Sequence, residues 1–146
     1  MSEAPADRRW DPVTECGPFS DHAGLFYQTR DALDPAEDMR LGFRVAPHHC
    51  NLRPHCHSGM LSSFLDIALA RGLRVVGGIA PPLPTISLSI DFMAPALLGA
   101  WIDAWVRLGR IGKSTAFATA LVYADDMLIA RSNGISRHFT VAVRDT

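Results

Sequence analysis

The spacing of hydrophobic residues changes twice along the chain. Two short strand-like runs, at 24–30 and 39–47, precede a stretch at 57–78 in which apolar residues recur every three or four positions. That spacing gives an α-helix one apolar face, made by Leu61, Phe64, Leu65, Ala68 and Leu69. Because the Ser58 hydroxyl can cap the start and Gly77–Gly78 can stop the end, the pattern predicts one long central helix over 57–78.

Strict alternation replaces the helical spacing after the segment PPLP. In TISLSIDF, residues 85–92, the even positions are apolar and the odd positions polar, which predicts a half-buried strand with Thr85 on its polar face. Three further strand-like stretches follow, at 101–109, 114–124 and 127–141. Two short strands, one long helix and four long antiparallel strands predict an α+β layer structure, because one apolar helix face and one apolar sheet face can bury each other.

Length and composition indicate one domain behind a short leader. The 146 residues, 48% of them hydrophobic, can bury a single core but are too few for two comfortable ones. Residues 1–20 contain three prolines and a glycine, so we expect a loosely ordered leader before one domain over 21–146. Trp10 and Phe19 are the leader residues that could dock on this domain.

Charge and cysteine content narrow the function classes. With 14 Lys+Arg against 15 Asp+Glu, the chain has no basic field for nucleic acid. It has neither an apolar run of signal-peptide length nor the roughly 18 unbroken apolar residues of a membrane span, which predicts a soluble cytoplasmic protein. Three cysteines cannot all pair within one chain, so we expect Cys16, Cys50 and Cys56 to be free thiols.

Four features stand at fixed distances around the start of the predicted helix. His57-Ser58-Gly59 opens the helix, Asn51 stands six residues before His57, Asp66 follows nine after it, and IDFMAPA occupies 90–96. Over roughly residues 40 to 140, this arrangement resembles the hotdog-fold acyl-CoA thioesterases of the PaaI type. The resemblance implies a curved antiparallel sheet of five to six strands wrapped around one long central helix, and hydrolysis of acyl-CoA or arylacyl-CoA thioesters.

Each residue around the helix start has a possible role in the hydrolysis of a thioester. The carbonyl oxygen turns anionic and needs donors, which the backbone N–H groups of Ser58 and Gly59 and the side-chain amide of Asn51 can supply at the positive end of the helix dipole. His57 belongs to the same helix start. Asp66 is the candidate general base for the attacking water or, less favourably, a nucleophile that forms an anhydride.

The helix itself separates these groups. Ser58 and Asp66 are eight residues apart, so about 12 Å of helix lies between their backbones, and one thioester carbon can hardly touch both. A two-fold dimer in which the donors of one chain face Asp66 of the other resolves this separation. The resemblance implies the same homodimer with composite sites, and leaves open both the acyl group and whether two dimers pair into a tetramer.

The resemblance also implies supporting residues. Thr85 falls where the family often has a Ser or Thr that orients the water. Arg110, Lys113 and Arg137 fall where relatives touch the coenzyme A phosphates. Coenzyme A is then part of the substrate, and we expect no separate cofactor and no metal.

Each assignment has a plainer alternative. Asp66 can be a solvated or inter-subunit ion-pair residue, Asn51 a turn residue, and His57 a residue that packs or hydrogen-bonds at the helix start. Thr85 can be an ordinary strand hydroxyl, and the three basic residues plain surface charges.

Ser58 departs from the family pattern, which usually has Gly after the His, and Arg53-Pro54-His55 stands where a Gly is common. Because a side chain at Ser58 can crowd the thioester, a hotdog protein that binds an acyl thioester without hydrolysing it is the second hypothesis. A hydratase or dehydratase on the same fold ranks third, because no Asp–His motif precedes the helix.

The segment HHCNLRPHCH at 48–57 raises the question of a metal site. It contains four of the six histidines and two of the three cysteines. The cysteines are six residues apart and no second ligand cluster completes a zinc site, so a transition metal held between two copies is the weaker hypothesis. Its candidate ligands are His48, His49, Cys50, His55, Cys56 and His57.

Overall fold

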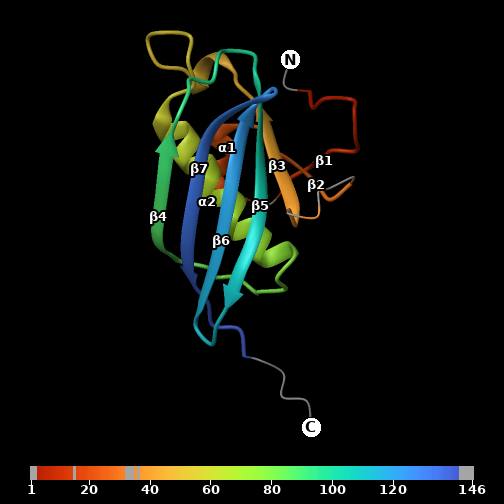
Figure 1. The fold of residues 1–146 in the computed structure, drawn as a ribbon, viewed down its shortest axis with the longest axis vertical. Coiled ribbons are helices and arrows are strands. Elements are labelled where there is room, and N and C mark those ends of the chain that lie inside the picture. The colour runs from red at the N-terminus through yellow and green to blue at the C-terminus, as the bar shows by residue number, and fades with distance from the viewer. Residues whose placement is uncertain (1–2, 15, 32–34, 36, 142–146) are drawn as a thin grey trace.

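The computed structural model describes residues 3–14, 16–31, 35 and 37–141. The strands form one antiparallel sheet in the order β1-β2-β3-β5-β6-β7-β4, and the long helix α2 lies across one face of it (Figure 1). The elements in chain order are β1 (Asp11–Pro12), α1 (Pro18–Ala23), β2 (Tyr27–Thr29), β3 (Met39–Arg44), the 3-10 turn η1 (Pro47–His49), α2 (Ser58–Val75), β4 (Thr85–Phe92), β5 (Trp101–Ile111), β6 (Thr115–Ala124) and β7 (Met127–Arg137). This is the predicted α+β arrangement.

The apolar face of α2 forms the centre of the core. Its buried residues keep the predicted spacing: Leu61, Phe64, Leu65, Ala68, Leu69 and Leu73. Small residues on the sheet allow the helix to approach closely, since a Cβ at Gly134 of β7 would lie only 2.7 Å from Leu69 Cδ1. Asp66 stands at the margin of this close-packed face, on the side of α2 that is next to β4.

Both ends of α2 differ from the prediction. The N-cap is His57 rather than Ser58, because His57 Nδ1 accepts a hydrogen bond from Gly59 N at 2.8 Å. The helix ends at Val75, three residues early. Gly78 then has a φ of +68°, a left-handed conformation that favours glycine and turns the chain away from the helix axis.

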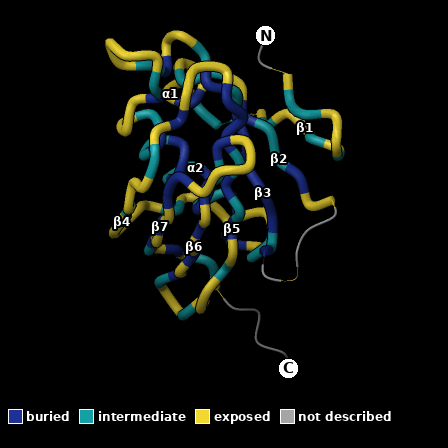
Figure 2. The backbone as a smooth tube through the Cα atoms, turned by 45° about the horizontal axis from the view of Figure 1, so that its top comes forward, coloured by how far each residue is buried: buried dark blue, intermediate teal, exposed yellow. Residues whose placement is uncertain are grey.

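Strand β4 runs along an open edge of the sheet. It pairs on one side only, with β7, and much of its backbone is exposed (Figure 2). Ile86 and Phe92 are 56% and 48% exposed, and only Leu88 and Ile90 are half-buried. The predicted half burial therefore holds for Leu88 and Ile90, which pack against the core, and is wrong for Ile86 and Phe92, because no described strand pairs with the outer edge of β4.

A β-bulge decides the face on which Thr85 lies. The register with β7 shifts between Thr85 and Ser87, so Ile86 is an extra residue in β4. Thr85 consequently shares the helix-facing side of the strand with Leu88. Strict alternation placed it on the opposite face, and the structure corrects that prediction.

The leader contacts the sheet. Strand β1 pairs with β2, and the ring of Trp10 meets that of Trp101 edge to face with 5.1 Å between centroids. Phe19, the other residue considered for docking, is 66% exposed. The sheet has seven strands rather than five or six because the leader adds β1, and the expected boundary at residue 20 falls inside α1. Among the described helices, none has the length and hydropathy needed to cross a bilayer.

Candidate active site

One unpaired backbone N–H group opens helix α2. Ser58 N has no hydrogen-bond partner among the described residues, whereas Gly59 N donates to His57 Nδ1. The expectation that both N–H groups are free is therefore wrong for Gly59, because the His57 ring accepts its hydrogen bond. Glycine gives the His57 ring room at this cap, since a Cβ at position 59 would lie 2.9 Å from His57 Nδ1 and the ring would have to shift.

The side-chain amide of Asn51 is turned into its own loop. The orientation that matches donors to acceptors places its nitrogen 2.9 Å from Arg53 O and 3.0 Å from His55 O. Both N–H groups of the amide then meet backbone carbonyl oxygens, so Asn51 holds this turn together. Donation to a substrate oxygen would require the side chain to rotate away from these partners.

The helix start borders a hollow of about 380 Å³. Asn51 and Ser58 line one part of it, and residues 92–96, which belong to the IDFMAPA motif, line another. The structure thus brings together three parts of the motif that are separated in the sequence.

Asp66 lies in a different hollow, of about 270 Å³, farther along α2. Thr85 Oγ1 donates to Asp66 Oδ1 at 2.5 Å, which ties the first residue of β4 to the middle of the helix. This bond occupies one carboxylate oxygen and leaves Oδ2 for another partner. Ile67, Ala70 and Leu83 give the hollow apolar walls.

The two hollows remain separate within one protomer. Among the described residues, none lines both of them. About 12 Å of helix separates Ser58 from Asp66, as the residue spacing implied. A single chain therefore does not bring its free N–H donor to its own Asp66 carboxylate.

Two arginines that the sequence analysis did not single out, Arg71 and Arg74, also line the Asp66 hollow. Arg71 Nε donates to Gln28 Oε1 at 2.5 Å, which fixes its guanidinium group. Arg74 is eight residues after Asp66 and so shares its helix face. The spacing of eight residues from Asp66 is the sequence signal that could have identified Arg74 as a residue of this hollow.

The three basic residues expected to touch coenzyme A lie at one end of the sheet. Lys113 lines a hollow of about 610 Å³ beyond the C-terminal end of α2. Arg110 is exposed near the end of β5. Arg137 ends β7, with its guanidinium carbon 5.0 Å from the ring centroid of Phe139. None of the three lines the hollow of Ser58 or that of Asp66.

The His49 side chain ties the histidine- and cysteine-rich segment to backbone groups on both sides of its ring. Ala46 N donates to His49 Nδ1 at 2.9 Å, and His49 Nε2 bonds to Ala23 O. Burial lowers the pKa of His49, and burial with a smaller effect of Cys50 raises the pKa of the Cys56 thiol to about 12. All three cysteines are free thiols. In the part of the chain that the structure describes, no three His, Cys, Asp or Glu side chains are grouped to hold a metal ion.

The sequence is similar to one protein family and to one curated protein. The sequence profile of the Thioesterase superfamily matches residues 54–130. A curated Pseudomonas aeruginosa protein, provisionally named an esterase, is 27% identical over 126 residues, which cover 86% of this chain and 92% of that protein.

Solved structures share the fold. A mutant of the phenylacetic acid degradation protein PaaI from Thermus thermophilus matches with a TM-score of 0.67 and 24% identity, over 84% of this chain and 100% of that chain. Zebrafish thioesterase superfamily member 2 matches with a TM-score of 0.65 and 20% identity, over 78% and 81% of the two chains. Since the profile spans more than half of the sequence, including β4, β5 and β6, the chain belongs to the Thioesterase superfamily and has its hotdog fold.

Proposed function

We propose that the protein hydrolyses acyl-CoA thioesters to a free acid and coenzyme A, with Asp66 as the base that activates water. The observation that carries this proposal is the hydrogen bond from Thr85 to Asp66 in a hollow with apolar and basic walls, in a chain of the Thioesterase superfamily. Because Thr85 holds Oδ1, the Oδ2 atom is the one available to a water molecule.

One water molecule, the Asp66 carboxylate and the Ser58 N–H group are sufficient for every step of the proposed hydrolysis. A water molecule gives a proton to Asp66 as its oxygen attacks the thioester carbon. The oxyanion of the tetrahedral intermediate accepts a hydrogen bond from the Ser58 N–H at the positive end of the helix dipole. When the C–S bond breaks, the coenzyme A thiolate leaves and takes up the proton from Asp66. Direct attack by Asp66, through an anhydride, is the less favoured route and would use the same carboxylate oxygen.

Two protomers complete the site in this proposal. The hollow of Ser58 includes Phe92, at one end of β4, and the hollow of Asp66 includes Thr85, at the other end. If β4 pairs antiparallel with β4 of a second copy, the Phe92 end of one strand meets the Thr85 end of the other. The Ser58 hollow of one protomer then lies beside the Asp66 hollow of its partner.

The surface beside β4 suits such a partner. The unpaired strand edge is accompanied by exposed apolar side chains, which are Ile86, Phe92, Met93, Leu97 and Leu98. Exposed apolar surface next to an open sheet edge favours association with another chain. A homodimer, alone or as half of a tetramer, is therefore part of the proposal.

The coenzyme A moiety has a basic path along α2. Arg71 and Arg74 follow Asp66 toward the C-terminal end of the helix, and Lys113 lines the hollow beyond that end. Nine residues, about 14 Å of helix, separate Asp66 from Val75. The phosphates of coenzyme A are separated from its sulfur by the whole pantetheine arm, so this length suits them. The proposed phosphate contacts remain Arg110, Lys113 and Arg137.

A second candidate is a hotdog protein that binds an acyl thioester without hydrolysing it. The helix start favours it, because Gly59 N–H is bound to His57 and the Asn51 amide faces its own loop, which leaves one ready oxyanion donor. The variant Ser58→Gly separates the two candidates. It should raise turnover in a thioesterase that the Ser58 side chain hinders, and leave a binding protein without turnover.

The proposal is tested by free-thiol release from coenzyme A thioesters with short, medium, long and aromatic acyl groups. We expect turnover of at least one, a loss of about 10²- to 10⁴-fold in Asp66→Asn, and retained turnover after treatment with a chelator. Circular dichroism and gel filtration check that Asp66→Asn keeps its fold and assembly. A folded protein that releases no thiol from the whole panel would overturn the proposal, and activity lost with the chelator would favour the metal hypothesis.

A further inference from the structure

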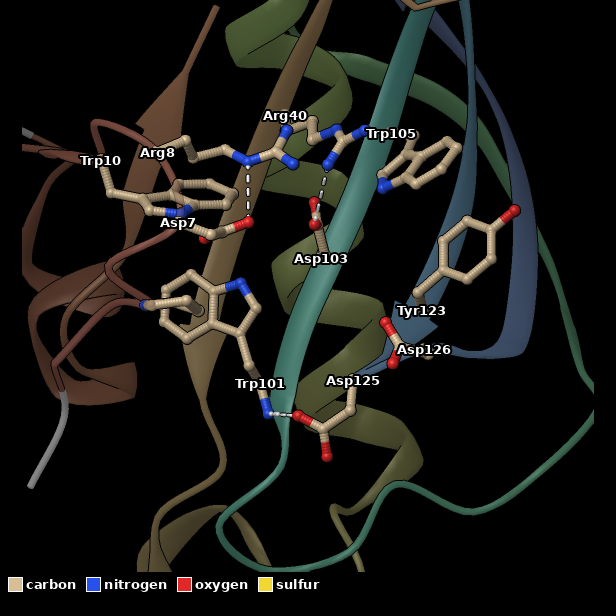
Figure 3. Close-up of a pocket in the computed structure, with 11 residues that line it drawn as sticks. Asp7, Arg8, Trp10, Arg40, Trp101, Asp103, Trp105, Tyr123, Asp125 and Asp126 are labelled. Atoms are coloured by element: carbon tan, nitrogen blue, oxygen red, sulfur yellow. Dashed lines mark hydrogen bonds and ion pairs between the residues drawn. The ribbon is translucent and has the colours of Figure 1, made fainter. Parts of the chain in front are cut away.

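A cavity of about 580 Å³ lies on the face of the sheet that α2 does not cover (Figure 3). Its floor includes Trp101, Asp103 and Trp105, which alternate along β5 with core residues that face the helix. Arg8 and Trp10 of the leader close it from the other side. All three tryptophans of the chain line this one cavity, and none of its lining residues lines the hollow of Ser58 or that of Asp66.

Five buried polar atoms around the cavity lack a hydrogen-bond partner. They are Arg8 Nη1, Trp10 Nε1, Trp101 Nε1, Asp103 Oδ1 and Trp105 Nε1. Only two other buried side-chain polar atoms are unpaired in the described residues. Trp101 is only 4% exposed, so bulk water does not readily reach its N–H group. Because buried polar groups are nearly always paired, their concentration here indicates a polar occupant of the cavity.

The charges around the cavity disfavour a charged occupant. Both guanidinium groups already have acidic partners: Arg8 Nε lies 3.2 Å from Asp7, and Arg40 forms bonds of 2.6 and 2.7 Å to Glu37. The lining holds further carboxylates, those of Asp103, Asp125 and Asp126. An anion would therefore meet an acidic surface, and a cation would leave four N–H donors without an acceptor.

A hydroxylated ring satisfies both kinds of unpaired atom. Two open groups along β5 are the N–H donor of Trp101 and the carboxylate acceptor of Asp103, on residues about 6.6 Å apart. A hydroxyl group accepts from one neighbour and donates to the next. The guanidinium carbon of Arg40 lies 4.1 Å from the ring centroid of Trp105, so the apolar surface for the C–H groups of a sugar ring is that of Tyr123, whose centroid is 4.4 Å from that of Trp105.

We propose that this cavity binds a neutral polyhydroxylated molecule of monosaccharide size. The site is independent of the proposed thioester hydrolysis, because its residues lie on the opposite face of the sheet from Asp66. The leader forms its roof, so the contact between Trp10 and Trp101 helps to build the binding site.

Intrinsic tryptophan fluorescence reports directly on the cavity, since every tryptophan of the chain lines it. The experiment titrates the full chain with D-glucose, D-galactose, D-mannose and N-acetyl-D-glucosamine in the millimolar range. We expect a saturable change of emission with at least one of these sugars. Sodium acetate and tetramethylammonium chloride, the charged comparisons, should give no saturable change.

Two variants assign the response to the cavity. Asp103→Asn on the floor and Arg8→Gln in the roof should each weaken sugar affinity about tenfold or more, because each weakens or removes a hydrogen bond at an unpaired atom. Arg8→Gln leaves the sheet untouched, so it tests the site even if Asp103→Asn does not fold. Asp91→Asn changes an exposed carboxylate paired with Arg131 and should bind like the wild type.

Four results would overturn the proposal. One is the absence of a saturable change with all four sugars, and another is unchanged affinity in the folded variants. A response only to the acetate or ammonium compound would identify a charged occupant instead. An emission change that follows protein concentration alone would show that a second copy of the chain fills the cavity.

Discussion

Thr85 Oγ1 donates a hydrogen bond to Asp66 Oδ1 across 19 residues of sequence, at 2.5 Å. The bulge at Ile86 makes this contact possible, because it turns Thr85 to the side of β4 that faces α2. The hydroxyl holds one oxygen of the carboxylate and leaves the other exposed to the hollow. In the proposed reaction, Thr85 is therefore a positioning residue for Asp66.

Thr85→Val keeps the shape of the side chain and removes its hydroxyl. We expect kcat for acyl-CoA hydrolysis to fall about tenfold with KM nearly unchanged, because the Asp66 carboxylate loses its fixed orientation. Thr85→Ser should keep most of the wild-type kcat. Steady-state thiol release measures both constants, and full kcat in Thr85→Val would reduce Thr85 to an ordinary strand hydroxyl.

Lys113→Met removes a positive charge from the hollow beyond α2. We expect KM for an acyl-CoA to rise about tenfold at low salt, because a contact to phosphate is lost. KM for the matching acyl thioester of N-acetylcysteamine, which has no phosphates, should not change. Arg131→Met, at an exposed arginine paired with Asp91, is the control. Equal effects of Lys113→Met on both substrates would contradict this placement of coenzyme A.

Asp103 should make stability depend on pH. Burial raises the pKa of Asp103 from 3.8 to about 6, more than the charge of Arg40 lowers it. The folded chain therefore holds this proton more tightly than the unfolded chain does. Protonation of Asp103 therefore stabilises the folded chain, and this contribution is complete below about pH 4. It is lost as the pH rises through about 6, which lowers the free energy of unfolding by up to about 3 kcal/mol.

Denaturant unfolding between pH 4 and pH 7 measures this effect. The wild type should lose stability relative to Asp103→Asn as the pH rises, since the variant has no carboxyl group to ionise at that position. Asp91→Asn retains Asp103 and should retain its contribution to the pH dependence. Parallel curves for the wild type and Asp103→Asn would refute the role assigned to Asp103.

The fold and the main motif were predictable because their signals are local. The apolar repeat of α2 spans a few turns of one helix, and the spacing of Asn51, His57 and Asp66 lies within sixteen residues. Helix geometry alone also predicted that Ser58 and Asp66 are too far apart for one chain to use both. The separate hollows around these residues agree with that distance.

Other features depend on contacts between distant segments, which alternation and spacing do not reveal. The bulge that turns Thr85 toward Asp66 depends on the pairing of β4 with β7. The cavity of the tryptophans depends on docking of the leader, where Trp10 meets Trp101 from 91 positions away. The loss of Gly59 N–H as a free donor depends on the orientation of one side chain, that of His57.

Mixed dimers test the shared active site most directly. Ser58→Pro removes the free N–H at the first helical position, where proline is tolerated, and the extended backbone of His57 before it accepts a proline. Asp66→Asn removes the base. Each variant alone should release almost no thiol from an acyl-CoA that the wild type hydrolyses.

A heterodimer of the two variants, coexpressed with different tags and purified through both, contains one intact site. That site has Ser58 from one chain and Asp66 from the other. We expect it to release thiol at about half the wild-type rate per dimer. A heterodimer as inactive as the two variant homodimers would contradict an active site shared between protomers.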